Sequence, residues 1–204
     1  VTHAHTDHIE GVAALAAAHP GARFLKKPWP GRDERFPVSW HPLGDQDVVD
    51  IGGAQLVAIH TPGHAPDHLA FWHAPSRTAF VGDLVLRRGT VMIPGRGGDL
   101  AAYLASIERL RALRPSRLLP AHGEPIDRPE RTLARTLQQR QARERHVLDA
   151  LVAGPATVQA LVESIYDGLD PALLPAATET IRAHLDKLRD EGRVVDVDGR
   201  WIVG

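Results

Sequence analysis

Thr2-His3-Ala4-His5-Thr6-Asp7-His8 stands at the start of this chain, and it places three histidines and one aspartate within six consecutive positions. In an extended segment alternate residues project to the same side, so His3 and His5 can face one metal ion. A turn after them can then bring Asp7 and His8 toward a second ion. We therefore interpret this stretch as the core of a metal site.

Further candidate ligands are spread along the chain, and each stands beside a glycine. They are His64 in Thr61-Pro62-Gly63-His64, Asp83 in Gly82-Asp83, and His122 in His122-Gly123. Glycine permits a tight turn and a close approach of the backbone to a bound group. One His-x-His pair alone would be as typical of surface or core histidines. The combined set favours a metal site over that structural interpretation.

The set resembles the metallo-β-lactamase superfamily, whose hallmark is Thr-His-x-His-x-Asp-His followed by a Pro-Gly-His loop, a Gly-Asp strand end and a late His-Gly. Residues 1 to about 128 carry the resemblance. It implies the α/β class and an αββα sandwich. Residue by residue, it implies a first metal held by His3, His5 and His64, a second held by Asp7, His8 and His122, and Asp83 as the bridge between them.

The resemblance also implies the chemistry of the site. Two zinc ions are expected, because all-nitrogen and carboxylate-containing donor sets both suit zinc. The iron-binding flavoprotein members carry glutamate where this chain has His5. Iron and manganese remain alternatives, since single-iron persulfide dioxygenases share much of the motif. Asp7 is the candidate catalytic residue, which orients the bridging hydroxide or carries its proton.

Composition limits the class of protein. The chain has 204 residues, a net charge of −1 and 43% hydrophobic residues, which is ordinary for a globular protein. A near-zero charge argues against a generally basic nucleic-acid binder. The absence of cysteine excludes thiolate zinc sites and fits a cytoplasmic protein. We expect no membrane partner and find no sign of an obligate protein partner. Because Val1 stands directly before the motif, we expect roughly 50–80 residues of opening strands to be absent, on typical domain sizes.

Hydrophobic periodicity and turn residues predict the elements of the first part. We expect a helix over 7–18 capped by Asp7, a strand over 23–25, an irregular loop over 26–42, strands over 55–60, 69–72, 78–81 and 118–121, a glycine-rich loop over 87–98, and a helix over 100–113 capped by Asp99.

The pattern changes after Pro129. We expect a long helix over 129–153, a second helix after Thr157, a third from Asp170-Pro171 to about 191, and a hairpin around Asp198-Gly199. Helices followed by a hairpin form a winged helix. The sequence therefore predicts a metallohydrolase domain over 1–142 and a winged-helix-like domain over 143–204.

Several motifs look like the subgroup that contains the mitochondrial β-lactamase-like endoribonuclease. They are Tyr103-Leu104-x-Ser106, Pro120-x-His122-Gly123-x-Pro125-Ile126, Arg140-x-x-Arg143-Glu144, Ile165-Tyr166 and His184-Leu185-x-Lys187-Leu188. This resemblance implies cleavage of single-stranded RNA. The leading hypothesis is a dinuclear zinc phosphodiesterase. The alternatives are a glyoxalase II-like thioester or lactone hydrolase, and a winged-helix nucleic-acid-binding protein whose metal domain is not catalytic.

Other polar residues have roles that the sequence leaves open. Arginines on the helix over 129–153 are expected to contact phosphates; they are Arg131, Arg135, Arg140, Arg143 and Arg145. Arg87, Arg88 and Arg96 are expected to be mainly solvated. Asp67 is a candidate acceptor behind the metal ligands and His68 a candidate substrate contact, each weighed equally against a loop-stabilising role. His60 is expected to pack structurally, and His19, His41, His73, His146 and His184 to lie at the surface or in caps.

Overall fold

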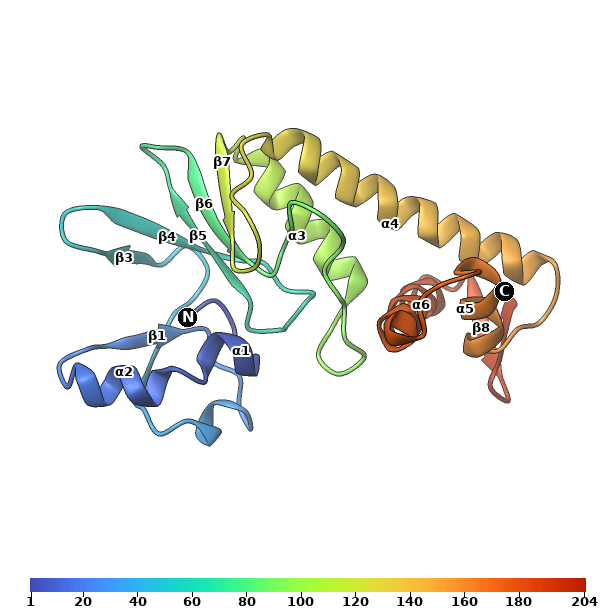
Figure 1. Ribbon diagram of the computed structural model, residues 1–204, viewed down its shortest axis with the longest axis horizontal. Helices are drawn as coiled ribbons and strands as arrows, with labels where there is room; N and C mark the ends of the chain where they lie inside the picture. The colour runs from blue at the N-terminus through green and yellow to red at the C-terminus, as the bar shows by residue number, and fades with distance from the viewer.

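A five-stranded sheet forms the centre of the first part of the molecule in this computed structural model, which describes residues 1–204 (Figure 1). The strand order is β3-β4-β5-β6-β7, and every neighbouring pair is antiparallel except β6 and β7, which are parallel. The bounds are β3 Val48–Asp50, β4 Gln55–His60, β5 Leu69–His73, β6 Thr78–Gly82 and β7 Arg117–Pro120.

Four of these strands confirm the predicted ones to within a residue or so at each end, which is the usual uncertainty of strand limits. Their central residues are buried, as at Ala58, Ala70 and Ala79. Strand β3 was not predicted, because it is short and its Val48 side chain is 56% exposed. A strand without a buried face has no hydrophobic periodicity to reveal it.

A smaller lobe carries the first strand and helices and lies beside the sheet (Figure 1). Its strands β1 (Phe24–Lys26) and β2 (Trp40–Pro42) pair in parallel, with a short 3-10 turn η1 (Asp33–Arg35) between them. The segment expected to be an irregular loop therefore contains two short elements.

The helix predicted over 7–18 is in two pieces, α1 (Thr6–Ile9) and α2 (Val12–Ala18). Gly11 stands at the start of α2, and glycine is a poor residue for a continuous helix interior. The prediction that Asp7 caps this helix was also wrong. His5 is the cap residue, and no side chain accepts a hydrogen bond there.

Helix α3 (Leu100–Ala112) covers the sheet and contributes four of the 14 buried residues of the first hydrophobic core. As predicted, Asp99 caps it by accepting a hydrogen bond of 2.9 Å from the Ala102 amide. Tyr103, Ile107 and Leu110 are fully buried against the sheet. The Tyr103 hydroxyl donates to the Leu84 carbonyl at 2.8 Å, which fixes the loop after β6 against α3.

The last third of the chain is the predicted winged helix. It contains α5 (Val158–Ile165), a 3-10 turn η2 (Pro171–Leu173), α6 (Leu174–Asp190), and a hairpin of β8 (Val194–Val197) and β9 (Arg200–Val203). Thr157 and Asp170 cap their helices as expected. Asp198 and Gly199 have φ angles of 52° and 79°, as a type I′ turn requires. A second hydrophobic core, separate from the first, holds this part together.

Helix α4 (Pro129–Val152) joins the two parts and belongs to both (Figure 1). Leu133 and Leu137 pack into the first core, and Val147 and Leu151 pack into the second. The boundary predicted between residues 142 and 143 falls inside this helix and stays a prediction. No helix, including α4, combines the length and the apolar character needed to cross a membrane.

Candidate metal centre

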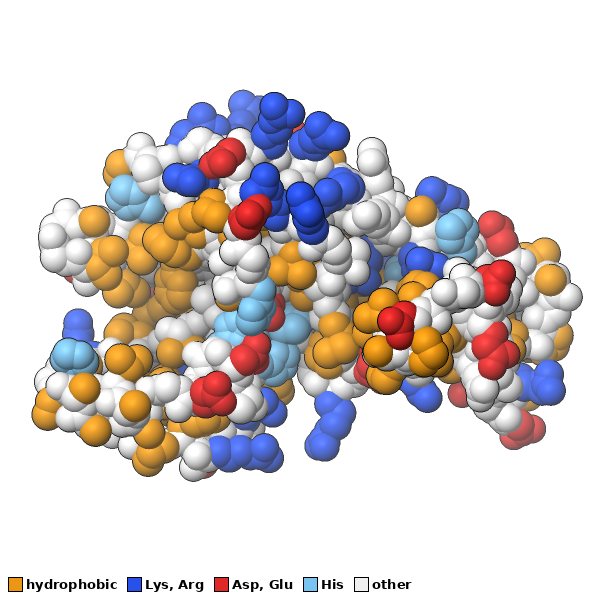
Figure 2. Space-filling view, viewed as in Figure 1, with side chains coloured by type: hydrophobic (Ala, Val, Ile, Leu, Met, Phe, Trp, Pro, Cys, Tyr) orange, Lys and Arg blue, Asp and Glu red, His pale blue; other side chains and the backbone are white.

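Histidines and carboxylates from four separate places in the chain meet at one edge of the sheet. The segment that leads into α1 supplies His3 and His5, and α1 itself supplies Asp7 and His8. His64 follows β4, Asp83 follows β6, and His122 follows β7. Figure 2 shows the histidines gathered in a hollow of the surface beside the smaller lobe. All seven residues that the sequence singled out therefore lie together.

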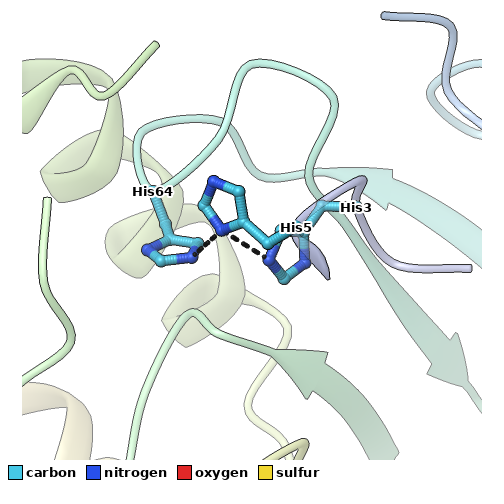
Figure 3. Close-up of side chains that lie close together, drawn as sticks. All are labelled: His3, His5 and His64. Carbon is cyan, nitrogen blue, oxygen red and sulfur yellow. Dashed lines mark hydrogen bonds between the residues drawn. The ribbon is translucent and has the colours of Figure 1, made fainter. Parts of the chain in front are cut away.

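His3, His5 and His64 form the more buried group (Figure 3). The Nδ1 atom of His5 lies 3.1 Å from Nε2 of His3 and 2.8 Å from Nε2 of His64. Two nitrogen ligands on a tetrahedral zinc lie roughly 3.3 Å apart, given zinc–nitrogen bonds of about 2.0–2.1 Å. The spacing of these donors is close to that value, so the three imidazoles could hold one metal ion.

Asp7, His8 and His122 form a second group on the open side of the site. Oδ2 of Asp7 lies 3.4 Å from Nε2 of His8 and 3.2 Å from Nε2 of His122. The two histidine nitrogens are 3.2 Å apart. The Asp7 and His122 side chains are 60% and 50% exposed, so solvent or a substrate can reach this group directly.

Asp83 lies between the two groups. Its Oδ2 atom is 3.4 Å from both His8 Nε2 and His64 Nε2, and its Oδ1 atom is 3.5 Å from His122 Nε2. Oδ1 is buried and accepts no hydrogen bond. A buried carboxylate oxygen without a partner is costly. A cation at this place would supply the missing partner, and the donor set therefore fits a pair of metal ions.

The protonation of His3, His5 and Asp83 suits metal binding. Burial, and then the neighbouring imidazoles led by His68, lower the pKa of His3, and burial with His64 and Arg32 lowers the pKa of His5 to about 4. Both rings are thus neutral at physiological pH, which is the form that binds a metal. Burial opposes ionisation of Asp83, but the hydrogen bond and charge of His8 prevail and hold the pKa of Asp83 below its usual range.

Atoms behind the donors fix the orientation of the rings. The Nδ1–H group of His64 donates to the Met92 carbonyl at 2.7 Å, which leaves Nε2 with its lone pair toward the site. The Thr2 hydroxyl lies 3.1 Å from Nδ1 of His3. Met92 belongs to the glycine-rich loop, and no local sequence motif predicts its contact with His64.

Of the two roles weighed for His68, the structure supports the loop-stabilising one over the substrate contact. It is fully buried, and its Nε2 atom accepts a hydrogen bond of 3.0 Å from the backbone amide of Asp83. Its other nitrogen, Nδ1, then donates to the Thr61 hydroxyl at 2.8 Å. Burial, with a smaller contribution from His64, lowers the pKa of His68 to about 3, which keeps this arrangement intact. His68 therefore positions Asp83.

Asp67 also differs from the expected acceptor behind the metal ligands. Its carboxylate is completely buried and lies 3.2 Å from the ammonium group of Lys26, which is itself completely buried. Lys26 also pairs with Asp33 at 2.5 Å. These ions join the loop after β4 to the smaller lobe that carries His3 and His5, so Asp67 acts through that connection.

Two glycines beside candidate ligands are required by geometry. Gly63 has a φ of +127°, and a Cβ atom there would lie 2.3 Å from the Tyr103 backbone. Gly82 has a φ of +47°, and its Cβ would lie 2.6 Å from Nε2 of His68. Both positions confirm that the backbone approaches its neighbours closely next to a ligand.

A cavity of about 450 Å³ opens over the second group of donors. Asp7, His122 and Asp83 line it together with two residues that the sequence did not single out, Arg32 and Thr90. Arg32 donates from Nε to the Ala4 carbonyl at 2.6 Å, so it also holds the segment between His3 and His5. A lone arginine in a proline-rich loop gave no signal of this role.

The arginines of α4 do not form the predicted row of phosphate contacts. Arg135 donates to the Arg87 carbonyl at 2.8 Å, Arg140 is buried, and Arg143 stacks on Tyr166 with its Cζ atom 3.9 Å from the ring centroid. Of the five, only Arg131 and Arg145 are exposed. These side chains turn inward because α4 packs against both cores along its length.

The remaining histidines and loop arginines largely follow expectation, with one exception. His19, His41 and His146 are exposed, His73 is half-buried, and His60 contacts the Pro66 carbonyl at 2.9 Å. In the glycine-rich loop, Arg87 pairs with Glu124, while Arg88 and Arg96 are exposed. His184 was expected at the surface or in a cap but is 1% exposed, because it lies on α6, which packs against α4.

Two family models match the chain. Residues 1–122 match the family described as "Metallo-beta-lactamase superfamily", and residues 157–201 match the "Beta-lactamase associated winged helix domain". The second match covers the helices and the hairpin that the structure assigns to the winged helix.

Curated relatives cover the chain almost completely. The "Beta-lactamase-like protein 2 homolog" of Drosophila melanogaster is 30% identical over 205 residues, which is 95% of this chain and 68% of the relative. An "Atrochrysone carboxyl ACP thioesterase" of Emericella nidulans is 31% identical over 199 residues, which is 95% of this chain and 62% of the relative. The chain thus spans roughly two thirds of the length of these relatives.

Solved structures share the fold. A beta-lactamase domain protein from Burkholderia ambifaria matches 100% of this chain and 74% of its own with a TM-score of 0.85, at 23% identity. TTHA1623, solved in a di-iron-bound form, matches 66% of this chain and 73% of its own with a TM-score of 0.56, at 30% identity.

Proposed function

The chain belongs to the metallo-beta-lactamase superfamily and is a metallo-hydrolase of that fold, and from this premise we propose that it hydrolyses acyl thioesters at a site for two zinc ions. The observation that carries the proposal is the position of Asp83 between two groups of donors spaced for metal binding. The relationship to acyl carrier protein thioesterases supports the thioester as substrate.

The proposed ligands divide between two ions. His3, His5 and His64 would hold the first, and Asp7, His8 and His122 the second, with Asp83 shared. Histidine and carboxylate donors without thiolates suit zinc. The di-iron form of TTHA1623 makes iron the alternative that metal analysis must test.

The chemistry follows from this arrangement. When bound, the metal pair polarises the carbonyl oxygen of the substrate and lowers the pKa of a water toward neutrality. Oδ2 of Asp7 faces His8 and His122, which leaves Oδ1 to orient that water and accept its proton. His68 holds the Asp83 backbone and Met92 holds the His64 ring, so neither donor has to reorganise during turnover. The half-exposed His122 leaves the second group accessible to an acyl chain.

Cleavage of RNA, the leading hypothesis from the sequence, has less support. It relied on the arginines of α4 as a surface row of phosphate contacts along the helix, and three of the five instead face inward. The mixed charges of α6, where Arg189 pairs with Asp186 and Asp190, also differ from a one-sidedly basic surface. We keep the domain boundary between residues 142 and 143 as a proposal. We also propose that the winged helix contacts the substrate.

The test is a panel of substrates assayed with the zinc-loaded protein. The panel contains an acyl-coenzyme A, an S-acyl glutathione, labelled single-stranded RNA and a β-lactam. We expect thioester hydrolysis that His5→Ala abolishes and that His41→Ala, an exposed control, leaves unchanged. Elemental analysis should return two zinc ions per chain. Cleavage of RNA with the thioesters intact, or a single metal, would overturn the proposal.

A further inference from the structure

A second cavity, of about 290 Å³, lies where the winged helix meets the metal-binding part. Arg140 and Arg143 from α4, Tyr166 from the end of α5 and Thr180 from α6 line it. Thr90, from the glycine-rich loop, completes it and also lines the cavity over the metal donors. The two cavities therefore have Thr90 in common as a lining residue.

The cavity contains cationic side chains without counter-ions. Arg140 is 3% exposed; its guanidinium donates to the Val91 carbonyl and lies over the Tyr103 ring, and its Nε atom has no hydrogen-bond partner. Arg143 stacks on Tyr166 and reaches the Ile165 carbonyl at 3.5 Å. Neither arginine pairs with a carboxylate.

Nearby groups do not supply the missing negative charge. Glu144, the next residue on α4, pairs instead with Lys187 at 2.7 Å and with Arg193 at 3.0 Å. His184 lies one turn beyond Thr180, is buried, and has no partner for either ring nitrogen. Burial first, and then Arg140 and Arg143, lower its pKa to about 3, which marks the positive potential of this junction.

An arginine buried without a counter-ion is expensive, and an anion that entered the cavity would remove that cost. Guanidinium groups match phosphate oxygens with two parallel hydrogen bonds, which makes phosphate a good occupant. Acyl groups on coenzyme A and on carrier proteins are attached through a pantetheine arm, and the far end of this arm carries a phosphate in both cases.

We propose that Arg140 and Arg143 bind the phosphate of the pantetheine arm while the thioester lies at the metal donors on the other side of Thr90. This inference rests on the proposed thioesterase function and adds the group by which the substrate is recognised. It also gives the winged helix a function, because α6 closes the cavity with Thr180.

Binding is tested first without turnover, by calorimetric titration of the full, zinc-loaded chain with inorganic phosphate. Arg143→Gln should weaken phosphate binding about tenfold, as expected for the loss of a charged hydrogen bond. Arg145→Gln, an exposed arginine on the same helix, should leave it unchanged. Phosphate that binds equally well to Arg143→Gln would lie at the metals or elsewhere, and that result would overturn the proposal.

Turnover then separates substrate sources. The same acyl group is offered on coenzyme A, on carrier protein and on pantetheine without phosphate. Arg143→Gln should lower kcat/KM for both phosphate-bearing thioesters about tenfold relative to the pantetheine thioester, mainly through KM. An equal loss for all three would overturn the inference but keep thioesterase activity. No thioester hydrolysis, with phosphate binding still sensitive to Arg143→Gln, would refute the proposed function alone.

Discussion

Replacing Lys26 by methionine removes the only counter-ion of a completely buried carboxylate. The ammonium of Lys26 lies 3.2 Å from Oδ2 of Asp67, and both side chains are completely buried. Methionine keeps the length of the side chain, so the variant changes charge with little change in packing. Because the pair links the loop after β4 to the lobe that carries His3 and His5, the loss should be felt at the candidate metal centre.

The magnitude follows from burial. Breaking a buried ion pair by removing one partner typically costs about 3–5 kcal/mol, which is a large part of a total stability of roughly 5–15 kcal/mol. Burial already raises the pKa of Asp67 above its usual range against the attraction of Lys26. In the variant Asp67 therefore takes up a proton on folding. Protonation limits the loss of unfolding free energy to the lower end of this range, about 3 kcal/mol at pH 7.

The pH dependence supplies a second test. A carboxyl group whose pKa is higher in the folded than in the unfolded chain stabilises the fold below the unfolded pKa of about 3.9, and this stabilisation is lost as the pH rises. The deficit of Lys26→Met relative to the wild type should therefore be smaller at pH 5 than at pH 8.

Urea unfolding of the metal-free full chain, followed by circular dichroism at both pH values, measures this deficit. Lys27→Met is the matched control, because Lys27 forms no ion pair. Lys26→Met combined with Asp67→Leu should recover the part of the loss that comes from the unpaired Asp67, while the lost pair with Asp33 remains. A loss below about 1 kcal/mol, or a deficit that shrinks as the pH rises, would refute the assignment of Lys26 as the counter-ion of Asp67.

Two further predictions concern the metal centre and the second core. Asp83→Ala should lose both metal ions, because the carboxylate lies between the two groups of donors; elemental analysis that finds one ion retained would contradict a shared ligand. His184 is buried with its pKa lowered to about 3, so the unfolded chain binds a proton that the folded chain does not between about pH 6.5 and 3, and stability falls as the pH falls. Between pH 6.5 and 5 the free energy of unfolding, measured with urea, should fall by about 2 kcal/mol less in His184→Met than in the wild type. An equal dependence on pH in the two proteins would count against a neutral buried imidazole.

The sequence predicted those parts of the molecule that local rules determine. The hairpin at Asp198-Gly199 and the caps at Asp99 and Thr157 are confirmed, because turn and cap residues act within four positions. The candidate metal donors could be found for a similar reason, since their chemistry is carried by residue types that rarely cluster otherwise. Their assignment to individual ions stays a prediction.

The sequence could not predict side-chain partners from distant elements. His68 accepts a hydrogen bond from Asp83, and His184 is buried against α4, yet neither residue has a local pattern that separates it from a surface histidine. The inward direction of the α4 arginines could not be predicted for the same reason. Arg140 and Arg143 carry charge, and only the packing of α4 between two cores shows that this charge faces the interior.

Helix α4 also determines how the winged helix is rotated about the helix axis relative to the metal-binding part. Each residue of an α-helix advances about 1.5 Å and turns about 100°. One residue inserted between Leu137 and Val147 would therefore swing the whole winged helix around the axis of α4 by about a quarter turn and separate Thr180 from Thr90. This stretch of α4 should accept substitutions on its exposed side but no insertion or deletion, because its length sets the relative orientation of the two parts of the molecule.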